Sequence, residues 1–267
     1  MSRRLYATNA RLAELRWSLD ELDWLLLRDV EAMRVAQATD LQALQDLRAE
    51  LHVRSFRRRL QRLTEERLLE RLDRVVGGRR AGSAGFVYIL GKAGQQLLAA
   101  EHEQPATRRP WTPRPAWLAH ALAVSRLYVT LRQAEAAARL KLVTFEAEPT
   151  SWRPFVGSHG TPTLLKPDAF VLVEQDLFSD RRFIEVDCGT ESPATLARKF
   201  DVYWRYFQSG QEQLQHGIFP SVLWLAPTKA REDVLQAVAK RQPTDAQPLH
   251  VVSLYANANQ TFSEEPP

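Results

Sequence analysis

Residues Thr163-Leu-Leu-Lys-Pro-Asp-Ala-Phe-Val-Leu-Val173, followed after a polar turn by Arg182-Phe-Ile-Glu-Val-Asp187, predict two adjacent apolar strands with acidic side chains at their ends. Residues i and i+2 of a strand share a face, so we expect Glu185 and Asp187 to point together and to meet Asp168 across a hairpin. Three convergent carboxylates form an oxygen-only ligand set that suits Mg²⁺ or Mn²⁺. The alternative is an ordinary turn at Asp168 and a solvent-facing strand end.

The composition restricts the class of protein. The chain has 267 residues, 45% of them hydrophobic, which is enough for two domains with separate cores. It contains no apolar run of roughly 18 residues and no apolar signal core, so we expect a cytoplasmic protein that does not enter a membrane. Cys188 is the only cysteine, which excludes an intrachain disulfide and a cysteine-based zinc site. The absence of a Gly-Lys-Ser/Thr loop and of paired histidines argues against ATP hydrolysis and histidine-metal relaxase chemistry.

The net charge of +4 is unevenly distributed along the chain. Residues 1–110 hold 20 Lys and Arg against 15 Asp and Glu, and residues 48–80 hold 11 Arg against 5 acids. Basic charge concentrated in one segment is typical of a phosphate-binding surface, although a solvated amphipathic helix has the same composition.

Hydrophobic periodicity predicts three helices in and before this basic segment. The first begins at the capping-box pattern Ser18-Leu-Asp-Glu21, the second begins near Thr39, and the third covers residues 53–70. In the third helix, apolar side chains recur at i, i+4 and i+7 from Phe56, and arginines occupy the opposite face. These arginines are Arg54, Arg57, Arg58, Arg59 and Arg62.

Two strands, residues 71–76 and 86–90, follow the third helix and are joined by a glycine-rich loop with Arg79 and Arg80 at its tip. Three helices followed by a basic hairpin predict a winged helix-turn-helix, in which the second helix of the pair enters the major groove. Arginine matches guanine edges and phosphates, so double-stranded DNA is the expected partner. A winged helix that contacts protein, with arginines that serve solubility, is the alternative.

The rest of the chain alternates between helix and strand, and the predicted fold class is mixed, α+β or α/β. We predict a winged helix over residues 1–104, a proline-rich linker over 105–116, a second domain over 117–255 and a disordered tail over 256–267. Residues 149–162 are expected to form an irregular loop that covers the site. The other predicted elements of the second domain are a helix at 117–140, strands at 142–148, 164–173 and 182–187, a helix at 193–208, a strand at 221–225, a helix at 228–241 and a strand at 250–255.

The order helix, three strands, helix, strand, with acids on the second and third strands, resembles the restriction-endonuclease-like core of the PD-(D/E)XK nucleases. More narrowly, residues 18–255 are similar to the replication-relaxation family of plasmid and mobile-element proteins. The segments that carry this resemblance are Gly77-Gly-Arg-Arg-Ala-Gly-Ser83, Pro167-Asp168 and Phe183-Ile-Glu-Val-Asp-Cys-Gly-Thr190, with Lys199 and Tyr203 beyond them. The resemblance implies a role in plasmid replication, DNA relaxation or mobilisation.

The nuclease resemblance implies a catalytic set of Asp168, Glu185, Asp187 and Lys199, with the three acids as metal ligands. Nucleases of that superfamily carry lysine where this chain has Asp187, and the ammonium group helps to position the attacking water. Lys199, on the following helix, is the first candidate to supply that charge, and Lys166 is the second.

Two functions remain open. In the favoured one, the protein is a sequence-specific DNA-binding factor of a mobile element, and its nuclease-like domain serves binding or assembly. In the other, it is a metal-dependent endonuclease or nickase that the winged helix directs to a site. A protein-binding adaptor is a third reading. Besides double-stranded DNA, the partners considered are replication or conjugation proteins and a second copy of the chain.

Overall fold

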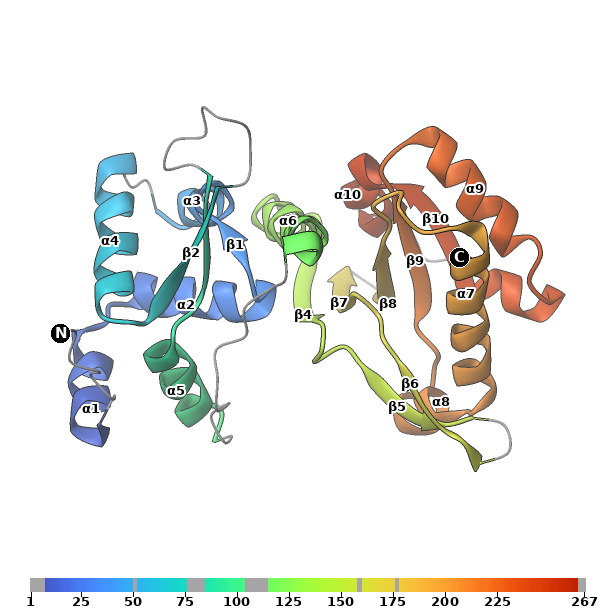
Figure 1. Cartoon of the computed structure of the whole chain (residues 1–267), viewed down its shortest axis with the longest axis horizontal. Helices are drawn as coiled ribbons and strands as arrows, with labels where there is room; N and C mark the ends of the chain where they lie inside the picture. The colour runs from blue at the N-terminus through green and yellow to red at the C-terminus, as the bar shows by residue number, and fades with distance from the viewer. Residues whose placement is uncertain are drawn as a thin grey trace. The chain divides into compact units, whose positions relative to one another are not determined.

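The computed structural model describes two compact units, Met1–Val129 and Thr130–Pro267 (Figure 1). The predicted wing arginines Arg79 and Arg80, and all but the end of the predicted linker, lie outside the described residues. The described residues are 8–49, 52–75, 85–103, 115–157, 160–175 and 178–263.

The first unit combines helices with a small antiparallel sheet of strand order β1-β3-β2. The long helix α6 begins in this unit, where its side chains Leu118 and Leu122 pack against Val35 and Leu72. The helices are α1 (Asn9–Ser18), α2 (Glu21–Met33), α3 (Ala38–Asp46), α4 (Val53–Glu65), α5 (Lys92–Glu101) and α6 (Pro115–Ala136), and the strands are β1 (Ala36–Gln37), β2 (Leu69–Val75) and β3 (Phe86–Leu90).

The helix boundaries differ from the prediction at two places. The capping box of α2 consists of Asp20 and Asp23, whose side chains accept from each other's backbone N–H, rather than of Ser18 and the following glutamate. Ser18 instead ends α1, where its hydroxyl donates to a backbone carbonyl. Helix α4 ends at Glu65, because Arg67 adopts a left-handed backbone conformation with φ 59° and the chain then enters β2.

Helix α4 is attached to the first turn of α2 by ion pairs. Arg59 contacts Asp20 at 2.6 Å and also Asp23, and Arg62 contacts Asp23 as well. The Asp23 side chain is 1% exposed and that of Arg59 15%. The hydrogen bond from Arg59 lowers the pKa of Asp20, with smaller contributions from the Asp23 backbone N–H and from Arg62. The capping acids of α2 therefore also fix the orientation of α4.

The second unit contains a mixed five-stranded sheet of strand order β10-β9-β8-β7-β4. Strands β8, β9 and β10 are parallel, and β7 is antiparallel to both β8 and β4. The strands are β4 (Lys141–Ala147), β5 (Arg153–Val156), β6 (Pro162–Leu165), β7 (Ala169–Gln175), β8 (Phe178–Val186), β9 (Ser221–Ala226) and β10 (His250–Leu254). The helices are α7 (Pro193–Gln208), α8 (Gln211–His216), α9 (Lys229–Ala239) and α10 (Ala258–Ser263), with 3₁₀ turns η3 (Thr244–Leu249) and η4 (Tyr255–Asn257).

Helices α7 and α9 cover one face of this sheet and enclose an aromatic core (Figure 1). The ring of Phe200 on α7 stacks on Trp224 of β9 at 4.1 Å between centroids, and Phe183 of β8 contacts Tyr203 and Tyr206. Apolar side chains are buried between helices and sheet as the alternation predicts, which confirms a mixed α+β fold.

Besides the unpredicted helix α8, three segments of the second unit differ from the prediction. The strand predicted over 164–173 is interrupted at Pro167-Asp168, which separates β6 from β7. The segment predicted as an irregular loop contains β5, which pairs with β6 and buries Phe155. The tail predicted to be disordered forms η4 and α10 up to Ser263, because Phe262 is fully buried and lies beneath the guanidinium of Arg182.

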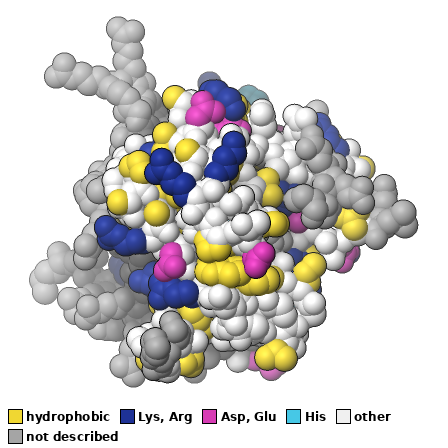
Figure 2. All heavy atoms as spheres, turned by 90° about the vertical axis from the view of Figure 1, so that its right-hand side faces the viewer, with side chains coloured by type: hydrophobic (Ala, Val, Ile, Leu, Met, Phe, Trp, Pro, Cys, Tyr) yellow, Lys and Arg dark blue, Asp and Glu magenta, His cyan; other side chains and the backbone are white. Residues whose placement is uncertain are grey.

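None of the described helices is long and apolar enough to cross a membrane. Figure 2 shows the side of the molecule that bears α7 and α9, where hydrophobic side chains are exposed among basic and acidic ones. The large exposed hydrophobic side chains of this unit include Val143, Val156, Leu164, Leu214 and Ile218.

Replacing Arg59 should destabilise the protein, whereas replacing its neighbour Arg58 should not. In Arg59→Met the buried Asp23 loses one of its cationic partners, so we expect the free energy of unfolding to fall by about 1–3 kcal/mol. Arg58 is exposed, so Arg58→Met should change it by less than about 0.5 kcal/mol. Urea denaturation followed by circular dichroism measures both, and equal effects would contradict the structural role of Arg59.

Candidate functional site

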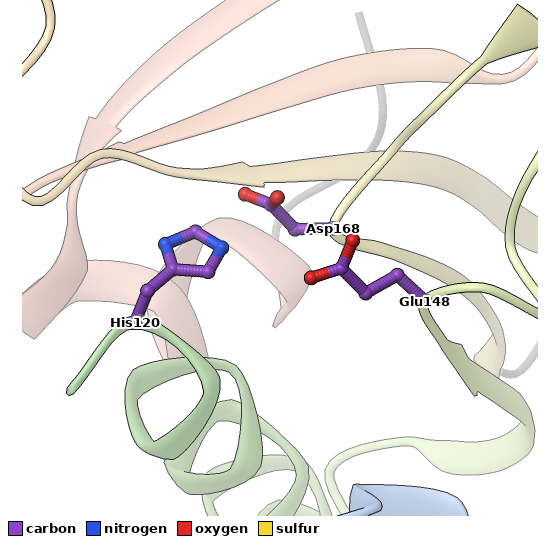
Figure 3. Close-up of side chains that lie close together, drawn as sticks. All are labelled: His120, Glu148 and Asp168. Carbon is purple, nitrogen blue, oxygen red and sulfur yellow. The ribbon is translucent and has the colours of Figure 1, made fainter. Parts of the chain in front are cut away.

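The register of β4 and β7 places two acidic side chains side by side at adjacent strand ends. Ala147 lies opposite Ala169, so the next positions along the two strands, Glu148 and Asp168, are also opposite each other. The Glu148 N–H donates to the Asp168 carbonyl at 3.0 Å, and their carboxylate oxygens approach within 4.8 Å (Figure 3). The third side chain drawn there, His120, belongs to α6 in the first unit.

The register of β7 and β8 adds a third carboxylate to this row. Ala169 lies opposite Ile184, which places Asp168 opposite Glu185. The Asp168 N–H donates to the Ile184 carbonyl at 3.0 Å, and one oxygen of the Asp168 carboxylate accepts from the Val186 N–H at 2.7 Å. Residues directly opposite each other on antiparallel strands share a face of the sheet. One acid from each of three neighbouring strands therefore lies in a single row.

Glu185 is the buried end of this row. Its side chain is 4% exposed, and it accepts from the Tyr203 hydroxyl at 2.7 Å and from the Lys199 ammonium at 3.2 Å. Burial and the nearby charge of Asp168 raise the pKa of Glu185 to about 8, although Lys199 and Tyr203 act in the opposite direction. The Glu185 carboxyl therefore holds a proton more tightly than an exposed glutamate does.

Lys199 extends from α7 to the carboxylate row. Its ammonium also contacts Glu191 at 3.1 Å. Burial opposes the charged form, but the charges of Glu185, Asp168 and Glu191 together raise the pKa of Lys199, so its side chain stays protonated. Lys166, the other predicted cation, is exposed, and its ammonium lies 4.8 Å from the centre of the Trp152 ring.

Asp187 is bound by Arg231, a residue that is not among the predicted site residues. Arg231 on α9 forms two hydrogen bonds to its carboxylate, one of them at 3.1 Å, and the Gly189 N–H donates to it at 3.0 Å. The same guanidinium donates to the Glu191 carbonyl at 2.8 Å. Arg231 lies in the first turn of α9, where the helix dipole disfavours a cation. An arginine at such a position indicates a nearby acidic partner, and this was the signal for the contact in the sequence.

The arginines predicted to contact DNA fall into two groups. Arg54, Arg57 and Arg58 are exposed on α4, and no ion pair involves them within the described part of the chain. Arg59 and Arg62, by contrast, are held by the acids at the start of α2.

A groove runs beside the exposed arginines between α3, α4 and the strands β2 and β3. Its volume is about 1160 Å³. Its polar lining includes Gln42, Arg57, Gln61, Arg71 and Lys92. The first unit thus carries its exposed cations next to a surface depression.

A family model described as replication-relaxation matches residues 27–222. This range is most of the chain and includes α4, the row of carboxylates and Lys199. No curated protein and no solved structure matches the sequence.

The raised pKa of Glu185 makes the stability of the protein depend on pH in a defined direction. A carboxyl whose pKa is raised from 4.5 to about 8 by folding contributes stability that is complete below 4.5 and is lost as the pH rises through about 8. Glutamine does not titrate. The Tm of Glu185→Gln, measured relative to that of the wild type at the same pH, should therefore rise between about pH 5 and about pH 9. Thermal melts of Glu174→Gln, an exposed acid of β7, provide the control and should not show this trend.

Proposed function

The chain belongs to the replication-relaxation family, and we propose that it is a double-stranded DNA-binding protein of a plasmid or mobile element that acts in replication, DNA relaxation or mobilisation. In this proposal the first unit binds the duplex, and the second unit is a nuclease-like domain. The observation that carries the proposal is the arrangement of α4 with its three exposed arginines beside a three-stranded sheet.

The order and pairing of the elements in the first unit support its assignment as a winged helix. The chain runs α2, β1, α3, α4, β2, β3, and the short β1 closes the sheet by pairing with β3. Helix α4 is the second of the α3–α4 pair, which is the position of the helix that enters the major groove in such proteins. Its apolar residues Phe56, Leu60 and Leu63 are buried, so the opposite face is left for a ligand.

The arginines of α4 have different roles in this proposal. Arg54, Arg57 and Arg58 contact phosphates or guanine edges. Arg59 and Arg62 act indirectly, because their ion pairs with α2 hold the helix at a fixed orientation. The loop arginines Arg79 and Arg80 lie outside the described residues, and their contact with phosphates rests on the sequence.

The elements from the end of α6 onward support a PD-(D/E)XK-like domain, because their order is a helix, the antiparallel strands β4, β7 and β8, a helix and a parallel strand. Glu148, Asp168 and Glu185 supply only oxygen ligands, and their mutual repulsion is of the kind that a divalent cation relieves. We assign Glu148 to this set because Asp187, the third predicted ligand, is bound by Arg231. When bound, Mg²⁺ or Mn²⁺ would polarise a phosphate and activate water.

A metal-dependent endonuclease or nickase is the alternative function, and Lys199 favours it. The chain has Asp187 where such nucleases have lysine, but the Lys199 ammonium is already 3.2 Å from Glu185. From that position it can hold a phosphate oxygen next to the carboxylate row. The DNA-binding function does not depend on this chemistry.

Removing two exposed arginines of α4 should weaken duplex binding without affecting folding. For Arg54→Ala with Arg58→Ala we expect a several-fold loss of affinity, and the slope of log affinity against log salt should become shallower by up to about 1.8. Fluorescence anisotropy over a range of salt concentrations measures both quantities. The control, Lys240→Ala with Arg241→Ala, removes the same charge from exposed positions after α9. Equal effects of the two double variants would contradict specific contact by α4.

The carboxylate row should respond to divalent metal. Mg²⁺ or Mn²⁺ should raise the Tm of the wild type, and Asp168→Asn or Glu148→Gln should remove that increase. Asp201→Asn, at an exposed position of α7, is the matched control and should keep it.

A nicking assay with two further variants separates the two functions. Nicking of supercoiled DNA that needs metal and is lost in Asp168→Ala and Lys199→Ala would establish the nuclease. A metal-dependent Tm without nicking would support a binding role for the second unit. No change in Tm would contradict the metal site.

A further inference from the structure

The chain between Glu148 and Asp168 leaves the sheet as the hairpin β5–β6, which extends beyond the sheet beside α8 (Figure 1). Its two ends are thus the acids at the ends of β4 and β7. Any molecule that lies against the base of this hairpin also lies next to the carboxylate row.

The inner face of the hairpin is fixed to the rest of the unit. Phe155 is buried and contacts the Tyr206 ring at 5.1 Å between centroids, and Leu165 is buried beside it. Arg153 forms ion pairs with Glu146 of β4 at 3.0 Å and with Glu212 of α8 at 3.4 Å. The hairpin is therefore held rigidly by packing and by charge.

The outer face of the hairpin is apolar and exposed. Pro154 pairs with Leu164, and Val156 pairs with Pro162, so all four outward positions are hydrophobic. Val156 is 65% exposed and Leu164 38%. A continuous apolar patch of this kind typically marks a binding surface. Because proline has no N–H to donate, each strand is a poor template for a further strand, so the face and not the edge is the contact surface.

The charge of this segment indicates the kind of partner. Residues 149–167 contain no Asp or Glu. Arg153 is paired with acids on the inner face, whereas Lys166, next to β6, is exposed. A surface that combines apolar side chains with an exposed lysine and lacks acids of its own is compatible with a polyanion that also offers apolar groups. DNA does so where its bases are unstacked, because the base faces are then accessible between the phosphates.

We propose that the outer face of the β5–β6 hairpin is a wedge that contacts unstacked bases of DNA beside the carboxylate row. This inference rests on the proposed DNA-binding function. Apolar side chains such as leucine and proline insert between base steps in proteins that deform DNA. Opening a paired step costs free energy, so DNA that is already open at a mismatch should bind more tightly than the fully paired duplex.

The test compares a short duplex that carries a two-nucleotide mismatch with the same duplex fully paired. Val156→Ser with Leu164→Ser should weaken binding of the mismatched duplex by about tenfold and that of the paired duplex by less than about twofold. A 2-aminopurine beside the mismatch should change its fluorescence when the wild type binds, and this change should be lost in the double variant. Val143→Ser, a half-exposed position of β4, is the control and should behave as the wild type.

The outcomes separate the hairpin from the α4 surface. If the wild type does not prefer the mismatched duplex, or if the hairpin variant weakens both duplexes equally, the wedge is wrong and DNA binding by α4 stands. If the wild type binds neither duplex, both proposals fail. If the hairpin variant keeps its DNA preference but changes from dimer to monomer in sedimentation, the face joins two copies of the chain, and the wedge is again overturned.

Discussion

The antiparallel register of β4, β7 and β8 is the constraint on which the candidate site depends. A single line of opposite positions contains Glu148, Asp168 and Glu185, and a shift of one strand by one residue would turn its acid to the other face of the sheet. The repulsion between these neighbouring carboxylates is reduced by a backbone N–H that donates to Asp168, and by Lys199 and a tyrosine hydroxyl that donate to Glu185. These contacts compensate part of the negative charge that the row carries.

In both units a charged group connects a helix to a neighbouring element, with different consequences. In the first unit the buried Asp23 holds α4 through Arg59 and Arg62. These two arginines fix the helix, whereas the other arginines of α4 remain exposed. In the second unit Arg231 holds Asp187 and the Glu191 carbonyl, which fixes the segment after β8. Buried ion pairs of this kind contribute little net stability, but loss of one partner is costly. Their main effect here is to define how neighbouring elements are oriented.

Local pattern was sufficient to predict most helices and strands, and α7 has the predicted bounds. The position of Asp168 and Glu185 on adjacent strands also followed from the sequence. Pairings between residues that are far apart in the sequence could not be predicted from it. Arg231 and Asp187 are 44 residues apart, and periodicity on α4 shows which face is polar but not that Asp20 and Asp23 lie opposite it. The outer face of the β5–β6 hairpin was missed because its prolines suggested irregular structure.

The hairpin also bears on how such proteins diversify. Both of its ends are fixed by the sheet, since Glu148 and Asp168 are held by backbone hydrogen bonds to the neighbouring strands. Residues on its outer face can therefore be exchanged, and its tip lengthened or shortened, without displacing the carboxylates. Selection can thus act on the outer face of this insertion independently of the acids, as it does on surface loops that a rigid scaffold carries. Related chains would be expected to vary most between these two acids while keeping the strands around them.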